Sequence, residues 1–64
     1  MKGHWENNRY IEDYTWRATA WQAHNKKWLV SVWDYEKGDW VIRDVAYDTR
    51  EEAKAVVEAL VAMR

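Results

Sequence analysis

The chain has 64 residues, with 10 Lys and Arg against 11 Asp and Glu, and it contains neither cysteine nor proline. These numbers exclude a disulfide-bonded scaffold, a cysteine-ligated metal domain, a thiol enzyme and a proline-rich segment. No apolar run approaches the roughly 18 residues that span a bilayer, and the first residues lack an apolar signal-peptide core. We therefore expect a cytoplasmic protein that does not enter a membrane.

Residues 1–13 are polar, and Trp5, Tyr10 and Ile11 are scattered among charged side chains. The segment shows neither the period of 2 that is typical of strands nor the period of 3.6 that is typical of helices. The sequence therefore predicts an N-terminal arm over residues 1–13, followed by a single domain over residues 14–64.

Residues 14–24, 27–35 and 39–47 are rich in β-branched and aromatic residues, and all three segments are predicted to be strands. Gly38 stands at the third position of a three-residue hairpin loop, where a left-handed conformation is needed. An odd-length connection around residues 24–26 would keep even-numbered residues of the first two strands on one face. The register expected from the turn at Gly38 pairs Tyr35 with Asp39, Trp33 with Val41, Val32 with Ile42 and Ser31 with Arg43.

The last segment has the signals of a helix over about residues 49–63. Thr49 and Glu52 have capping-box spacing, and the first turn is acidic, as the helix dipole favours. An apolar stripe recurs at helical spacing, formed by Ala53, Val56, Val57, Leu60 and Val61. We therefore predict an α+β fold, a three-stranded antiparallel β-meander with one C-terminal helix packed on one face in the order β-β-β-α.

Even-numbered strand residues supply the apolar face on which this helix is expected to pack. They are Trp16, Ala18, Ala20, Trp28, Val30, Val32, Trp40, Ile42 and Ala46. The same alternation places Asp44 on that face, opposite Val30. A carboxylate there is not explained by the predicted packing, unless it lies beyond the footprint of the helix.

The odd-numbered residues point to the other face, which combines tryptophan, tyrosine and aliphatic side chains with two arginines. They are Thr15, Arg17, Thr19, Trp21, Leu29, Ser31, Trp33, Tyr35, Val41, Arg43, Val45 and Tyr47. Trp, Tyr and Arg are enriched at binding hot spots, and a contiguous exposed patch of this kind marks an interface. The expected partner-binding residues are Arg17, Trp21, Leu29, Trp33, Tyr35, Val41 and Arg43. Two other interpretations are that the arm covers this face as internal core, or that the two faces are reversed.

Residues that could carry catalysis have simpler structural explanations. Ser31 is the only serine and lies in mid-strand, while His24 belongs to a turn. His4 and Glu6 are two ligands on a polar segment and do not make a closed metal set. The paired carboxylates fit solvated turns and a helix cap, and no Gly-rich phosphate loop exists. We therefore expect no enzyme activity, no cofactor, no metal and no small-molecule substrate.

Residues 28–60 resemble the HicB-type antitoxin domain through two motifs, Trp-Leu-Val-Ser-Val-Trp-Asp-Tyr-Glu-Lys-Gly-Asp-Trp-Val from position 28 and Asp-Thr-Arg-Glu-Glu-Ala from position 48. That resemblance implies a β-β-β-α fold that binds and inhibits a toxin. The family's Pro-Gly-Cys segment is absent here. The chain also resembles the arm-type DNA-binding domain of tyrosine recombinases through Trp16-Arg-Ala and the helix start at residues 49–53. Each resemblance covers about half of the chain.

The sequence favours a small non-enzymatic interaction module, of the inhibitor, antitoxin-like or mobile-element accessory kind. It would bind a protein partner, or a second copy of itself as a homodimer, through the aromatic sheet face. The alternative is nucleic-acid binding through the same face, with bases stacking on aromatic side chains beside Arg17 and Arg43. The net charge of −1 weighs against that alternative.

Overall fold

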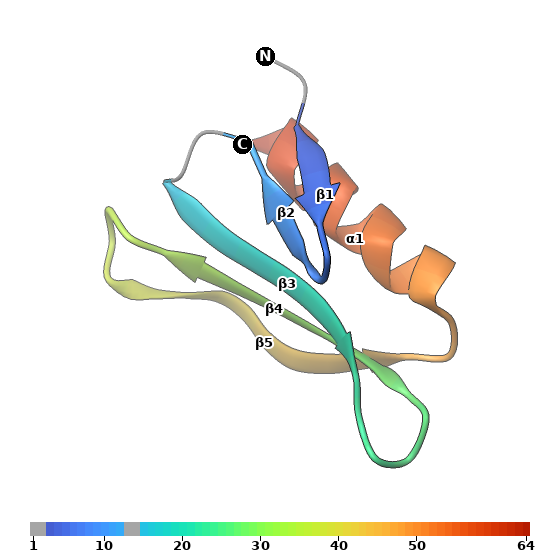
Figure 1. The fold of residues 1–64 in the computed structure, drawn as a ribbon. Coiled ribbons are helices and arrows are strands. Elements are labelled where there is room, and N and C mark those ends of the chain that lie inside the picture. Colours follow the sequence, from blue (N-terminus) through green and yellow to red (C-terminus); the bar gives the residue numbers. More distant parts are fainter. Residues whose placement is uncertain (1–2, 13–14) are drawn as a thin grey trace.

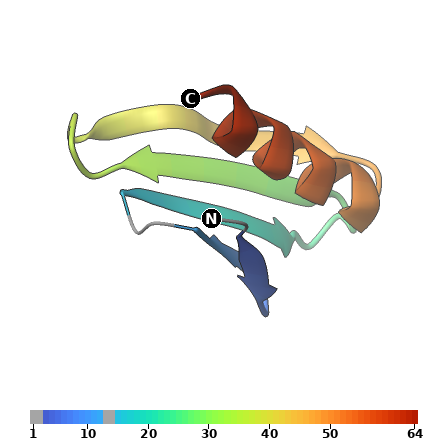
Figure 2. The ribbon, with the colours of Figure 1, turned by 90° about the horizontal axis from the view of Figure 1, so that it is seen from above.

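The computed structural model describes residues 3–12 and 15–64, which form an antiparallel sheet and a C-terminal helix. The elements in chain order are β1 (His4–Glu6), β2 (Arg9–Ile11), β3 (Trp16–Gln22), β4 (Trp28–Asp34), β5 (Asp39–Tyr47) and α1 (Arg50–Met63). Consecutive strands are neighbours throughout the sheet, and α1 packs on β3, β4 and β5 (Figures 1 and 2). The expected α+β class, an antiparallel sheet with a C-terminal helix, is confirmed.

The expected count of three strands is wrong, because the described part of the chain contains five. Strands β1 and β2 lie within the segment expected to be an arm, and they extend the sheet past β3 (Figure 1). Each has only three residues, which is too few to show a period of 2. Asn7 turns the chain between them with a φ of 57°, a conformation that asparagine tolerates well. Residues 1, 2 and 13 of the expected arm and residue 14 of the expected first strand lie outside the described residues.

The helix forms as predicted, whereas the turn at Gly38 is one residue longer than expected, because Asp34 rather than Tyr35 pairs with Asp39. Thr49 is the N-cap of α1, and its side chain accepts a hydrogen bond from the Glu52 backbone N–H at 3.2 Å. This contact satisfies one of the backbone donors that a helix start leaves without a partner. Gly38 has a φ of 66°, the left-handed conformation that the hairpin needs.

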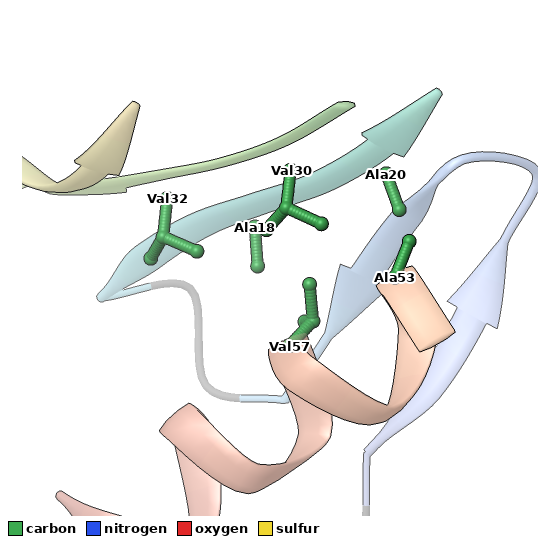
Figure 3. Close-up of a cluster of buried hydrophobic side chains, with 6 residues drawn as sticks. All are labelled: Ala18, Ala20, Val30, Val32, Ala53 and Val57. Atoms are coloured by element: carbon green, nitrogen blue, oxygen red, sulfur yellow. The ribbon is translucent and has the colours of Figure 1, made fainter. Parts of the chain in front are cut away.

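The core lies between α1 and the central strands and is built from small side chains. Its fully buried members point toward one another in Figure 3 and are Ala18, Ala20, Val30, Val32, Ala53 and Val57. The alanines of β3 and α1 let the helix approach the sheet closely. The prediction that even-numbered residues of β3 and β4 face the helix is therefore confirmed.

Strand β5 departs from the predicted register from the turn onward, where Asp34 pairs with Asp39, and it contains irregularities on either side of Ile42. Val32 pairs with Ile42 as expected, but Trp33 pairs with Trp40 instead of Val41, and Val30 pairs with Val45. In a β-bulge, two residues of one strand oppose one residue of the other, so the side chains beyond it change face.

Five expectations about the faces of β5 are wrong, because the pairing of Asp34 with Asp39 offsets β5 by one residue on β4. Trp40 lies on the face opposite the helix, in contact with Trp33, and Ala46 follows it there as the partner of Leu29. Val45 and Tyr47 pair with Val30 and Trp28 and so lie on the helix side, where Tyr47 packs against the core. Asp44, which was expected on the helix side, lines a hollow on the opposite face.

Basic residues of the C-terminal segment cover indole rings on the helix side of the sheet. The distances to the ring centroids are 5.8 Å for Arg50 over Trp28, 4.9 Å for Lys54 over Trp5 and 4.8 Å for Arg64 over Trp16. Each contact combines a cation–π attraction with burial of the aliphatic stem of the cation. These three tryptophans therefore find their partners within the chain.

Asp34 is a buried carboxylate that closes the turn between β4 and β5. It is only 7% exposed, and its oxygens accept hydrogen bonds from the backbone N–H groups of Glu36 at 2.9 Å and Lys37 at 3.1 Å and from Trp16 Nε1 at 3.1 Å. The backbone bond from Lys37 is the main cause that holds the pKa of Asp34 below its ordinary value of 3.8, against the opposing effect of burial.

A carboxyl group whose pKa is lowered by folding stabilises the fold above its ordinary pKa, and this contribution is lost as the pH falls through the lowered value. We expect the free energy of unfolding to decrease below about pH 4. Asp34→Asn should be less stable at pH 7 and should show a smaller decrease on acidification. Urea titrations between pH 7 and pH 2 measure both effects. The control Glu58→Gln removes an exposed carboxylate of α1 and should keep the acid dependence of the wild type, and an unchanged dependence in Asp34→Asn would contradict the assignment.

Candidate functional site

The sheet face that α1 does not cover, here called the open face, contains a hollow of about 390 Å³. Beyond α1 no other described element packs on the sheet (Figures 1 and 2). Strands β3, β4 and β5 and the turn after β4 supply the lining of the hollow. The lining residues are Arg17, Thr19, Trp21, Ser31, Trp33, Tyr35, Trp40 and Asp44.

The irregularity of β5 that brings Asp44 into the hollow is held by Ser31. The Ser31 hydroxyl donates to Asp44 Oδ1 at 3.0 Å and accepts from the Asp44 backbone N–H at 3.0 Å. Asp44 has a φ of 50°, in the left-handed region that aspartate and asparagine tolerate better than most residues do. The serine therefore satisfies the backbone amide of Asp44 and also fixes its side chain within the hollow.

Aromatic rings form most of the remaining wall. Trp33 and Trp40 meet edge to face, with ring centroids 5.0 Å apart and an interplanar angle of 79°, a favoured geometry for aromatic pairs. Trp21, Tyr35 and Trp40 remain 42%, 52% and 41% exposed. Unlike the indoles on the helix side, these rings present much of their surface to solvent.

Charges of both signs line the hollow. The Arg17 guanidinium makes no ion pair or hydrogen bond with any residue in the described ranges. The second carboxylate oxygen of Asp44 lies 3.9 Å from Arg43 Nε, a long and exposed contact that contributes little. Arg17 and Asp44 therefore both keep capacity to bind a polar group from outside the chain.

The structure brings together four of the seven residues expected to bind a partner, because Arg17, Trp21, Trp33 and Tyr35 line the hollow. The other three lie beside it: Leu29 is half-buried and pairs with Trp21, Val41 is exposed next to the irregularity of β5, and Arg43 lies 5.3 Å from the centroid of the Trp40 ring.

Four lining residues were absent from that set, namely Thr19, Ser31, Trp40 and Asp44. Thr19 and Ser31 were expected on this face but were not singled out as partner-binding. The misfit of Asp44 on an otherwise apolar face was the signal in the sequence that could have revealed the change of face in β5.

The N-terminal segment does not cover the rings of the open face. Trp5 and Tyr10 contact each other in a tilted arrangement, with ring centroids 5.1 Å apart, and pack against the core on the helix side. Ile11 alternates with Tyr10 and is buried, but it does not line the hollow. The interpretation that these three residues form internal core over the open face is therefore wrong.

The lining of the hollow is suited to recognition by contact. It contains no histidine, cysteine or lysine that could act as a base or nucleophile beside Ser31. Within residues 3–12 and 15–64, no three His, Asp or Glu side chains gather in a way that could hold a metal ion. The helix of the described chain is not long and apolar enough to cross a membrane.

Comparisons with protein-family models, curated proteins and solved structures find no match for this chain. The candidate site is therefore defined by its own geometry.

The position of Asp44 in the left-handed region leads to a test by substitution. Asp44→Val should lower the free energy of unfolding by about 1–3 kcal/mol, because a β-branched residue is strained at positive φ. Asp44→Asn tolerates this conformation and keeps an oxygen for the Ser31 hydroxyl, so it should cost less than about 1 kcal/mol. Urea unfolding followed by tryptophan fluorescence gives both values, and equal losses would show that the left-handed conformation is not required.

Proposed function

We propose that this protein is a non-enzymatic interaction module that binds a protein partner through the hollow of the open face. One observation carries the proposal: the indoles on the helix side are each covered by a cation of the chain, whereas Trp21, Tyr35 and Trp40 stay exposed around a hollow. Exposed rings gathered around one concavity are typical of a surface that another molecule covers.

The composition of the lining supports a protein partner. Trp, Tyr and Arg are enriched among the side chains that act as hot spots in protein interfaces, and Arg17, Trp33 and Tyr35 line this hollow. Ring packing holds Trp33 and Trp40 in one arrangement, and a preformed surface loses less side-chain entropy on binding. An anchoring side chain of the partner would enter the hollow, with Arg17 and Asp44 binding polar groups at its rim.

An inhibitory role is the more specific form of this proposal. The resemblance of residues 28–60 to HicB-type antitoxin domains implies a toxin as the partner, and a rigid aromatic surface of this kind would act by occluding the partner's own site. A mobile-element accessory protein would use the same surface in the same way.

Nucleic-acid binding is the second candidate function, and a specific observation favours it. Arg17 and Arg43 lie beside the exposed rings of the open face, and Arg9, the strand partner of Thr19, projects on the same side. Bases stack on such rings while arginines bind phosphates. The carboxylate of Asp44 within the hollow would repel a phosphate backbone, so we favour the protein partner.

Selection from a displayed library of random peptides tests the proposal with a defined probe. We expect the selection to converge on peptides that bind the wild-type chain and that bind Trp40→Ala and Tyr35→Ala at least about tenfold more weakly. Met63→Ala removes an exposed apolar side chain at the end of α1 and should leave binding unchanged. Convergent peptides whose affinity is unchanged by the open-face substitutions would contradict the proposal, as would a selection on the monomeric chain that does not converge.

Titration of labelled single-stranded and double-stranded oligonucleotides at low and high salt tests the second candidate. Tight binding that falls steeply with salt and is lost in Arg17→Ala would favour nucleic acid over protein. No binding at low salt would eliminate it.

A further inference from the structure

We propose that the hollow of the open face is occupied by a second copy of this chain, which packs open face against open face about a two-fold axis. This inference rests on the proposed function, because it names the protein partner of the same surface. Three independent features of the structure lead to it: the charges of the hollow, the edges of the sheet and the size of the core.

The charges of the hollow are self-complementary. In an interface between two identical faces, residue i of one copy meets residue j of the other, and j meets i. Strands β3 and β5 flank β4, so a two-fold axis along β4 places β3 of each copy over β5 of the other. Arg17 belongs to β3 and Asp44 to β5, and each copy therefore offers a guanidinium to the carboxylate of the other.

The positions of Arg17 and Asp44 along the strands are compatible with this pairing. Arg17 is level with Trp33, its strand partner, and Asp44 is hydrogen-bonded to Ser31. Trp33 and Ser31 are two residues apart, which is about 7 Å along a strand. Sheets packed face to face lie about 10 Å apart, so the long Arg17 side chain can cross the interface to a carboxylate displaced by this distance along the strand.

The edges of the sheet are poorly suited to association, which leaves the face. Strand β5 is broken by irregular pairing on either side of Ile42, and its φ of 50° at Asp44 interrupts an extended edge. Strand β1, at the other edge, has only three residues. Short and bulged edge strands are the features that prevent sheets from pairing edge to edge.

The exposed aromatic surface is of the size that a dimer interface needs. An aromatic side chain offers about 150–250 Å², so Trp21, Tyr35 and Trp40, each 41–52% exposed, together leave roughly 300 Å² for a partner. A standard interface buries about 800 Å² on each side, of which a little over half is apolar. These three rings therefore supply most of that apolar share.

The internal core is small, so further burial of apolar surface would stabilise the chain. Its largest fully buried side chains are valines, Val30, Val32 and Val57, and no disulfide can reinforce the chain because it contains no cysteine. Domains below about 70–80 residues commonly add a metal, disulfides or a partner to a core of this size. Packing two open faces together would bury the aromatic rings that are exposed to solvent in each copy.

Sedimentation equilibrium between about 1 and 500 μM, a range that brackets micromolar affinity, tests this inference on the full chain. We expect the mass to rise with concentration from 7.8 kDa to twice that value. Arg17→Glu should raise the dissociation constant of the dimer at least about tenfold, because it places a second carboxylate next to Asp44 of the other copy. Lys26→Glu makes the same change of charge in the turn between β3 and β4, outside the hollow, and should change the constant less than about threefold.

A double-mutant cycle identifies the contact itself. If Arg17 meets Asp44 across the interface, Arg17→Ala should weaken the dimer much less in an Asp44→Asn background than in the wild type.

Tyr35→Ala removes a ring that is half exposed, so it should dissociate the dimer while the far-ultraviolet circular dichroism of the fold is retained.

Two results would overturn the inference. One is a mass of 7.8 kDa throughout the concentration range, and the other is a dimer whose dissociation constant is the same in Arg17→Glu and Tyr35→Ala as in the wild type. A monomer that still binds selected peptides through Trp40 would contradict only the inference that the partner is a second copy, and it would leave the proposed function intact. A monomer without open-face peptides would contradict both.

Discussion

The pairing of β5 with β4 is the constraint on which the surface of this protein depends. The register of the two strands changes on either side of Ile42, and the change is held at one end by the left-handed Asp44 and the two hydrogen bonds of Ser31. Because successive strand residues point to opposite faces, each displacement of the register exchanges the side chains that follow. If Tyr35 instead of Asp34 paired with Asp39, a regular β5 would direct Trp40 toward the helix and Tyr47 away from it.

The tryptophans of the chain divide between two environments with different requirements. On the helix side, Trp5, Trp16 and Trp28 lie around a core of alanines and valines, and each is covered by a cation from the C-terminal segment. The small core residues let the helix lie close to the sheet, so the large rings surround the core rather than fill it. On the open face no helix supplies such cover, and the rings stay partly exposed.

The change of face in β5 also determines what the open face can bind. Without it the face would carry arginines and rings alone, a combination suited to bases and phosphates. With it, a carboxylate stands in the middle of the aromatic wall, and the face combines unused groups of both signs. A protein surface can supply a charge opposite to each of these groups, whereas a phosphate backbone can pair only with the arginines. The same strand that shapes the face is also a poor edge for strand addition, so recognition is directed to the face.

The sequence by itself determined the local structure of this protein, because the signals for it lie within a few residues of one another. The cap at Thr49, the apolar stripe of α1 and the turn at Gly38 predicted the helix and the hairpin, and the even-numbered residues of β3 and β4 face the helix as their alternation predicted. Strands β1 and β2 were missed, because a strand of three residues is stabilised by its neighbours rather than by a pattern of its own.

Only the tertiary structure decided which side chains meet in the hollow. Asp44 adopts its conformation because Ser31, 13 residues earlier in the chain, supplies the hydrogen bonds that make it favourable, and no period in the sequence records a contact of that kind. The faces of Trp40, Asp44 and Tyr47 follow from the pairing of Asp34 with Asp39 at the turn, since a register displaced by one residue reverses the side chains of the strand.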